Sequence, residues 1–345
     1  MKMILDRDEV RWGIIGCGDV TEVKSGPGFR KAARSRLVAV MRRNAVLAED
    51  YARRHGVPRW YAEADQLICD PEVDAVYIAT PPETHLHFAL KVAAAGKPAY
   101  VEKPLARNAT ECDQMVTAFV QAEVPLYVAF YRRELPRFKA IKRLIDDGAI
   151  GRISGLSYVH SEPRHHTNDQ WRVDLRSAGG GLYLDLGSHV LDLFDFIFGP
   201  ITQVAGLAAN RGHRHQAEDV VAMSFAVATA VPAVGLWNFA AGARFEQCRV
   251  MGTEGMLEFA VFEDAPIRLF QFGGSQELVY PHPPHVQQPL IQTVVDDLLG
   301  RGACVSTGES ARRTARVMDD VLSSYYGGRE DAFWERLASR PHEAK

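Results

Sequence analysis

The 345-residue sequence lacks several features that would each point to a particular class of protein. Its five cysteines, at positions 17, 69, 112, 248 and 304, are too few and too scattered for a disulfide framework, so we expect a reducing compartment, the cytoplasm. No apolar run is long enough to span a bilayer, and the acidic residues at 6, 8 and 9 argue against a signal peptide. The formal net charge of −3, with both signs well mixed, points to neither nucleic acid nor a membrane surface as partner. A small-molecule partner is the remaining expectation.

Metal-binding patterns are also missing. Histidines pair up at 165–166, 213 and 215, and 282 and 285, but no cysteine or carboxylate accompanies them at ligand spacing. We therefore expect no metal site.

Two domains are predicted from the order of the elements. Strand and helix patterns alternate from residue 10 to about residue 130, which predicts an α/β Rossmann domain, a doubly wound parallel sheet, over 1–130. Short strands then follow at close spacing between residues 201 and 280, separated by turn signals. They predict an α+β domain over 131–345 with a large, mostly antiparallel sheet, closed by amphipathic helices near 286–299 and 309–326.

A glycine loop follows the first strand. The apolar segment 10–15 leads into Gly16-Cys17-Gly18-Asp19-Val20-Thr21, and a second strand, 37–41, comes about twenty residues later. In the dinucleotide fingerprint the first glycine makes the tight turn and the second admits the pyrophosphate. Thr21 replaces the third glycine, which predicts a helix slightly farther from its strand, interrupted by Ser-Gly-Pro-Gly at 25–28. The residues from Gly16 to Val20 are cofactor-binding candidates.

The second strand ends without the acidic residue that would bind the adenosine ribose hydroxyls of NAD. It ends instead in Arg42-Arg43. A guanidinium fits a phosphate bidentately, so this position favours NADP over NAD. The alternative is a solvated basic turn.

Two further strand ends carry polar residues. Segment 74–79 ends in Thr80-Pro81 and opens a helix at His85, and segment 96–101 ends in Glu102-Lys103-Pro104. Lysine just past the carboxyl end of a parallel strand points into the crevice where such sheets bind ligands. We expect Thr80, Pro81, His85, Glu102 and Lys103 to line the cofactor site, although a surface lysine is the alternative.

The most informative segment is Gly179-Gly180-Gly181-Leu182-Tyr183-Leu184-Asp185-Leu186-Gly187-Ser188-His189-Val190-Leu191-Asp192. The glycines let the backbone pass closely by something. On a helix, Asp185, His189 and Asp192 lie on one face, within an otherwise apolar and buried run. Buried polar groups must be satisfied, either as a core Asp–His pair or at a ligand site.

The glycine loop, Glu102-Lys103-Pro104 and this segment occur in an order and approximate spacing that resemble the glucose–fructose oxidoreductase/inositol dehydrogenase family, Gfo/Idh/MocA. The resemblance covers nearly the whole chain. It implies an NAD(P)-dependent oxidoreductase acting on a sugar, polyol or related compound, with Lys103, Asp185 and His189 in catalysis. It also implies that Arg132 lies near cofactor or substrate, and that an exposed sheet face makes a homodimer or homotetramer. Thr21 and Arg42 depart from the pattern, and Arg42 puts NAD preference in doubt.

The chemistry of hydride transfer also favours these three residues, independently of the family resemblance. Hydride transfer at a hydroxyl-bearing carbon requires a proton to move and charge on the oxygen to be stabilised. His189, with an ordinary pKa of about 6.5, suits the proton transfer. Lys103 would hold the same oxygen, and Asp185 would orient it. Because ionisable groups that lie close together titrate as a set, the sequence does not decide whether Lys103 or His189 is the formal acid/base. Enzymes with two such lobes have the active site between them, where Lys103 and His189 would meet.

Substrate contacts are expected just upstream of the motif. Trp171 and Arg172 are candidates for the substrate pocket, Asn168 and Asp169 for sugar hydroxyls, and loops 161–176 and 210–217 for specificity. Two other functions remain open: a redox-neutral enzyme of this fold that retains its cofactor, as some glycosidases do, and a dinucleotide-sensing regulator without catalysis.

Overall fold

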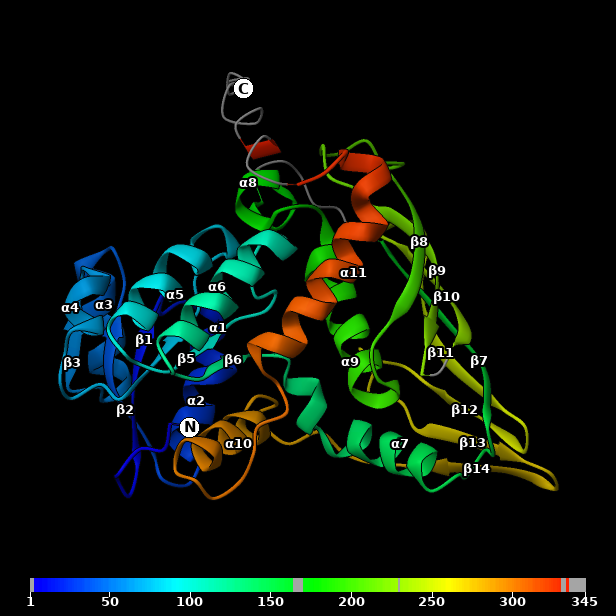
Figure 1. Cartoon of the computed structure of the whole chain (residues 1–345), viewed down its shortest axis with the longest axis horizontal. Helices are drawn as coiled ribbons and strands as arrows, with labels where there is room; N and C mark the ends of the chain where they lie inside the picture. Colours follow the sequence, from blue (N-terminus) through cyan, green and yellow to red (C-terminus); the bar gives the residue numbers. More distant parts are fainter. Residues whose placement is uncertain (1–2, 164–169, 229, 330–332, 335–345) are drawn as a thin grey trace. The chain divides into compact units, whose positions relative to one another are not determined.

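The computed structural model describes residues 3–163, 170–228, 230–329 and 333–334 (Figure 1). The chain forms two compact units that do not follow chain order. The first unit comprises Met1–Ala106, Glu111–Leu135 and Pro283–Arg312, and the second comprises Arg107–Thr110, Pro136–His282 and Arg313–Lys345.

A six-stranded parallel sheet forms the first unit, in the order β3-β2-β1-β4-β5-β6. Its strands are β1 (Val10–Ile15), β2 (Ser35–Met41), β3 (Arg59–Tyr61), β4 (Ala75–Ile78), β5 (Ala99–Val101) and β6 (Leu126–Val128). Every residue of β1, β4, β5 and β6 is buried, as is typical of a parallel sheet that helices cover on both faces. The order reverses between β1 and β4, which confirms the predicted doubly wound sheet.

Helices of the first unit connect these strands and cover them (Figure 1). They are α1 (Asp19–Val23), α2 (Ser25–Lys31), α3 (Ala45–His55), α4 (Ala64–Ile68), α5 (His85–Ala94) and α6 (Ala109–Gln121). The interruption expected at 25–28 is wrong, because these residues lie inside α2. A Cβ at Gly26 would lie 2.1 Å from the carbonyl oxygen of Thr21. Glycine is therefore what lets α2 pack directly against the preceding turn.

Helix α10 (Gln288–Leu298) completes the first unit from near the other end of the chain. Its apolar face, Leu290, Ile291, Val294, Val295 and Leu298, is fully buried in one cluster with Trp12 and Phe29. The sequence placed this segment in the domain 131–345, because its amphipathic pattern does not say which surface it covers.

The second unit contains an eight-stranded sheet in the order β14-β13-β12-β11-β7-β10-β9-β8. Its strands are β7 (Ile153–Pro163), β8 (Thr202–Ala209), β9 (Val220–Val227), β10 (Val231–Asn238), β11 (Ala240–Gly252), β12 (Gly255–Phe259), β13 (Ile267–Gln271) and β14 (Gly274–Leu278). Among the strands that the structure describes, only β7 and β10 of this sheet pair in parallel, which confirms the mostly antiparallel prediction.

One face of this sheet is covered by helices (Figure 1). Phe194 of α9 (Ser188–Phe198) stacks on Phe225 at 6.2 Å, and a Cβ at Gly206 would lie 2.7 Å from Val321 of α11 (Gly308–Tyr326). The short helices α7 (Pro136–Asp146) and α8 (Leu175–Ala178) complete the unit. On the other face Leu207 and Val234 are 68% and 55% exposed.

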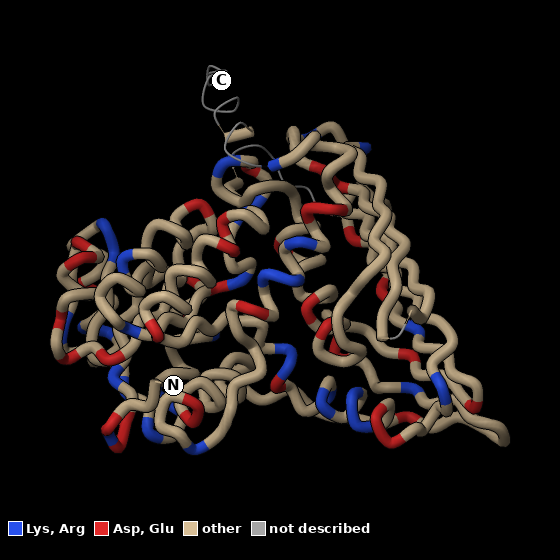
Figure 2. The backbone as a smooth tube through the Cα atoms, viewed as in Figure 1, with Lys and Arg blue, Asp and Glu red and all other residues tan. Residues whose placement is uncertain are grey.

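Charged residues of both signs are spread over each unit (Figure 2). Of the helices that the structure describes, none is both long enough and apolar enough to cross a membrane.

Candidate dinucleotide and substrate-binding residues

The glycine loop closes tightly against the end of β4. Gly16 has φ +90°, and a Cβ there would lie 2.6 Å from Thr80 Cγ2. The backbone nitrogens of Gly16 and Cys17 both donate to Met41 O, at 2.9 and 3.2 Å. A Cβ on Gly18, in contrast, would meet nothing nearer than Gly16 O at 4.0 Å. The loop is thus fixed on one side and open at Gly18, as close approach of a pyrophosphate requires.

Thr21 takes the place of the third glycine without leaving a polar group unsatisfied. Its side chain is fully buried, and its hydroxyl donates to Gly18 O at 2.7 Å. Its own carbonyl accepts from Tyr51 OH at 3.0 Å. The departure from the fingerprint therefore adds one side-chain hydrogen bond, from the Thr21 hydroxyl, that ties the first helical turn to the loop.

Cys17, Asp19 and Val20 complete the loop. Cys17 is 1% exposed, and burial raises the pKa of its thiol to about 11, so it is a neutral core side chain. Asp19 is exposed and Val20 half-buried at the start of α1.

Arg42 and Arg43 are exposed just beyond the end of β2. The backbone nitrogen of Arg42 donates to Tyr61 O at 3.2 Å, which fixes the turn. Its guanidinium is close enough to the glycine loop to oppose the effect of burial on the pKa of Cys17. An exposed guanidinium therefore lies beside the glycine loop.

His85 holds two of the predicted strand ends together. Its ring is fully buried, with Nε2 2.7 Å from Thr80 O and Nδ1 3.1 Å from both Pro104 O and Leu105 O. Burial lowers its pKa. The histidine predicted to bind cofactor thus fixes the turn after Lys103, whose peptide bond to Pro104 is cis.

Glu102 anchors the residue before that turn. Its carboxylate accepts hydrogen bonds from Tyr77 OH, from Gln287 Nε2 at 2.8 Å and from the backbone nitrogen of Lys103 at 3.2 Å. Gln287 precedes α10, so sequence reasoning had no signal for this contact. Lys103 is half-buried, and hydrogen bonds to Glu102 and His85 fix the backbone before and after it.

Pro81 and Arg132 are the remaining residues predicted to bind cofactor. Pro81 is half-buried directly after Thr80. The side chain of Arg132 is buried, and its guanidinium lies 5.2 Å from the ring centre of Tyr131.

In the second unit Gly180 and Gly181 lie against Glu218, just before β9, whereas Gly179 lies against Arg107. A Cβ at Gly181 would lie 2.1 Å from Glu218 O, and Gly181 N donates to Glu218 Oε2 at 2.8 Å. Glu218 is fully buried, which raises its pKa, and it also accepts from Tyr326 OH. The sequence showed that the glycines pass something closely, and the structure identifies it as Glu218.

The helix that follows differs from the predicted one. Tyr183–Gly187 forms a π-helical turn, and α9 begins at Ser188. The wider turn changes the spacing assumed for Asp185 and His189. The side chain of Asp185 is 23% exposed, whereas His189 and Asp192 are 5% and 1% exposed. Asp185 is therefore the most accessible of the three polar residues of the motif.

Arg172 and Trp171, two of the residues predicted to bind substrate, lie beside Asp185. Arg172 Nε lies 3.4 Å from Asp185 Oδ2, and its guanidinium stacks 4.5 Å from the ring centre of Trp171. Asn168, Asp169 and the histidines at 165 and 166 lie outside the described residues. An exposed indole, a guanidinium and a carboxylate together offer a stacking face, donors and acceptors.

An aromatic and histidine row on the sheet was not foreseen. The ring of His189 lies 6.2 Å from Phe262, which lies 5.3 Å from His160. His160 Nε2 is 3.4 Å from Glu162 Oε2. The signal was present, because residues 158, 160 and 162 alternate along one strand and face the same side.

Within the described ranges, no three His, Cys, Asp or Glu side chains gather in a way that could hold a metal ion.

The glycine loop at the switch point of a parallel sheet, with polar residues at its strand ends, is the arrangement of a Rossmann-fold dinucleotide-binding domain. Two family models match the chain: "Oxidoreductase family, NAD-binding Rossmann fold" over residues 10–130 and "GFO/IDH/MocA C-terminal domain" over residues 138–258. The chain belongs to the Gfo/Idh/MocA family of oxidoreductases, as the sequence motifs predicted.

Similar proteins support this assignment. Oxidoreductase P35 of Formosa agariphila is 37% identical over 90% of this chain and 97% of its own length. A 1,5-anhydro-D-fructose reductase of Ensifer adhaerens is 31% identical over 54% of this chain and 56% of its own. Among solved structures, levoglucosan dehydrogenase in complex with NADH and levoglucosan has a TM-score of 0.82 at 22% identity, covering 92% of this chain and 97% of that one.

Proposed function

We propose that the protein is an NADP-preferring dehydrogenase or reductase that transfers a hydride between nicotinamide and a hydroxyl or carbonyl carbon of a sugar, polyol or related compound. The observation that carries the proposal is the fixed backbone around Lys103 at the end of β5, held by Glu102 and His85. The names of the reductase and the levoglucosan dehydrogenase above support a sugar-like substrate.

We assign the contacts with the cofactor to residues of the first unit. The loop from Gly16 to Val20 suits the pyrophosphate because its Gly18 face is open. Arg42 and Arg43 suit the 2′-phosphate, and Thr80, Pro81, Glu102 and Arg132 follow strands β4 to β6, on the side expected for the nicotinamide. When bound, the nicotinamide supplies the site that accepts or gives the hydride.

Three side chains of this protein are assigned to the substrate oxygen. Lys103 would stabilise charge on that oxygen, His189 would move its proton, and Asp185 would orient it through the accessible carboxylate that Arg172 pairs with. Trp171 would stack against the apolar face of a sugar ring.

Absorbance at 340 nm tests the reaction, with NADP⁺ or NAD⁺ and a panel of aldoses, inositols and anhydro-sugars, and in reverse with keto-sugars. We expect substrate-dependent change that is faster with NADP(H). Arg42→Ala should reduce the preference for NADP at least tenfold, since a charge-assisted phosphate contact contributes about 1.5–3 kcal/mol. Arg36→Ala, at the opposite end of β2, is the matched control and should leave the preference unchanged.

Lys103→Met separates this function from the two others. Loss of turnover with dinucleotide binding retained supports the dehydrogenase, whereas full turnover would overturn the lysine assignment. Dinucleotide binding with no absorbance change, but with product formed, favours the redox-neutral enzyme. Binding with no product from any compound favours a sensor.

We further propose a homodimer or homotetramer formed through the uncovered face of the eight-stranded sheet. Leu207, Ala222, Leu236 and Val159 lie in one cross-strand row on that face. Sedimentation of the wild type should give a dimer or tetramer, and Leu207→Glu should give a smaller species. The five thiols are all free, which supports the cytoplasm as its location.

A further inference from the structure

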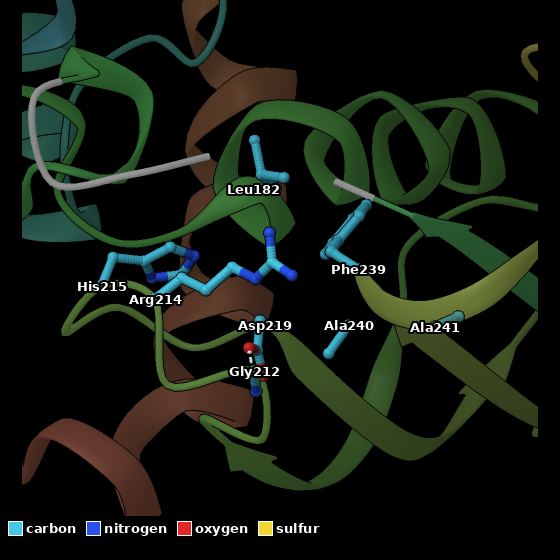
Figure 3. A pocket seen from close by; sticks show the side chains of 8 residues that line it. All are labelled: Leu182, Gly212, Arg214, His215, Asp219, Phe239, Ala240 and Ala241. Carbon is cyan, nitrogen blue, oxygen red and sulfur yellow. Dashed lines mark hydrogen bonds between the residues drawn. The ribbon is translucent and has the colours of Figure 1, made fainter. Parts of the chain in front are cut away.

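The polar side chains around a small cavity of the second unit serve the fold (Figure 3). The cavity has a volume of about 120 Å³, below the range of about 300–1,000 Å³ that is usual for small-molecule sites. Asp219, which lines it, accepts hydrogen bonds from the backbone nitrogens of Arg211 and Gly212, both at 2.7 Å. Asn210 donates to Ala217 O at 2.7 Å in the same loop. These contacts hold the loop closed, and no ligand is needed to account for them.

Gln287, in contrast, is a buried polar side chain that its own helix does not use. It is the N-cap residue of α10, yet its side chain makes no cap hydrogen bond. A capping side chain ordinarily accepts from a backbone nitrogen of the first helical turn. Gln287 is 1% exposed, and its Nε2 donates instead to Glu102 Oε1 at 2.8 Å. The amide therefore serves a contact outside α10.

Glu102 passes this contact on to Lys103. One carboxylate oxygen, Oε1, accepts from both Gln287 Nε2 and Tyr77 OH, and the other, Oε2, accepts from the backbone nitrogen of Lys103 at 3.2 Å. Since the two oxygens belong to one rigid group, the donors on Oε1 fix the direction in which Oε2 points. The backbone of Lys103 is thus held from two other elements, β4 and the start of α10.

Both donors to Oε1 are themselves fixed by the core of the first unit. Tyr77 is fully buried and stacks on Tyr100 with 5.2 Å between the ring centres. Gln287 accepts from Ile291 N at 3.0 Å through its carbonyl oxygen, and Leu290 and Ile291 are fully buried in the apolar cluster. The amide nitrogen has to face Glu102, because a flipped amide would place its oxygen against the carboxylate. The network therefore has one arrangement.

We propose that Gln287 is a positioning residue for catalysis: by holding Glu102, it fixes the backbone of Lys103 and hence the ammonium group that meets the substrate oxygen. The inference rests on the proposed function, because that function assigns the oxygen to Lys103. As Gln287 is buried, it acts through Glu102 and touches no reacting atom. Its effect is therefore on kcat rather than on dinucleotide binding.

Two substitutions at this position test the proposal in the 340 nm assay. Gln287→Met keeps the size but donates nothing, and a misplaced Lys103 should lower kcat at least tenfold at both pH 6 and pH 8. Gln287→Glu sets two carboxylates against each other, and one shared proton would restore a hydrogen bond between them. Its kcat should be at least tenfold below the wild type at pH 8 and within threefold of it at pH 6.

A merely structural role would give a different result. It would lower Tm and leave kcat unchanged for each folded molecule, so Tm and the Kd for NADP⁺ are measured for every variant at both pH values. We expect Kd to stay within threefold of the wild type. Gln288→Glu is the matched control, because it adds the same charge one residue along, where the side chain is exposed and donates to Lys31 O at 3.3 Å. It should keep the wild-type kcat.

The outcomes separate this inference from the function on which it rests. Wild-type kcat in Gln287→Met, or a loss in Gln287→Glu that does not shrink at pH 6, overturns the positioning role and leaves the proposed function standing. If the wild type turns over no compound, the proposed function fails, and acetylation by acetic anhydride follows Lys103 directly. Its rate relative to the exposed Lys24, from peptide mass spectrometry, should change at least threefold in Gln287→Met, and an unchanged ratio would overturn the role.

Discussion

Replacing Gly181 by alanine tests the contact on which the glycine motif depends. The new Cβ would lie 2.1 Å from Glu218 O and 3.1 Å from the carboxyl carbon of Glu218. Ordinary contacts are longer by roughly 1 Å, and the obstacle is a backbone carbonyl that belongs to a sheet strand end. The alanine therefore has to displace either the motif or the start of β9.

The cost follows from what must move. Overpacking a core costs about 1–3 kcal/mol and occasionally more, and an obstacle made of backbone places this variant near the upper end, at about 3 kcal/mol. For a domain of about 150–250 residues, 1 kcal/mol lowers Tm by roughly 2–4 °C, so we expect a decrease of about 6–12 °C. Because Asp185 and His189 follow in the same segment, a shift of about 1 Å should also lower kcat about a hundredfold.

Differential scanning calorimetry and the 340 nm assay measure both effects. Gly242→Ala is the matched control, because a Cβ there meets nothing within 4 Å and the variant should keep the wild-type Tm and turnover. A Gly181→Ala protein with wild-type Tm and kcat would refute the close approach of Gly181 to Glu218.

Three further predictions concern the first unit. Hydrogen bonds from Arg54 and His55 lower the pKa of Glu22 to about 2, so its contribution to stability is complete above its ordinary pKa of 4.5 and is lost as the pH falls through about 2. In urea unfolding, Glu22→Gln should therefore have a lower free energy of unfolding than the wild type at pH 7, and the difference should narrow at pH 3. A difference that stays constant with pH would contradict this prediction. Iodoacetamide at pH 8 should alkylate the exposed Cys69 well before Cys17, as followed by peptide mass spectrometry, and equal rates would show that the Cys17 thiol is neither buried nor raised in pKa. Arg11→Leu removes the bidentate partner of the Asp74 carboxylate, which is 6% exposed, while Arg7 Nε stays 3.0 Å from it, and should cost about 1.5–3 kcal/mol in urea unfolding. Arg36→Leu breaks an exposed pair with Glu9 and should cost less than about 1 kcal/mol, so similar losses in the two variants would be inconsistent with a buried Arg11–Asp74 pair.

The sequence predicted those parts of the molecule whose signal is local. Strand β1 and the glycine loop are adjacent in the chain, and buried parallel strands are recognisable as apolar runs. Ser25–Gly28 was read as a break because glycine and proline usually end helices, whereas here Gly26 serves the packing of α2 on Thr21. The π-helical turn before α9 was missed, since an apolar pattern does not distinguish a four-residue from a five-residue hydrogen-bond step.

Long-range partners of the site could not be predicted in the same way. Glu102 was identified, but its contact with Gln287 joins residues 185 positions apart, and nothing near either one indicates the other. Likewise the glycines indicated a close neighbour, while only the folded sheet makes that neighbour Glu218.

The burial of α10 in the first unit has a consequence for the order in which the protein forms. During synthesis the six parallel strands leave the ribosome long before Leu290, Ile291 and Val294, which complete the apolar cluster around Trp12 and Phe29. Contacts at such separation form slowly, because loop closure comes before any gain from burial. The nascent dinucleotide domain therefore has an exposed apolar face until residues 290–298 have been made, and exposed apolar surface of this kind favours aggregation.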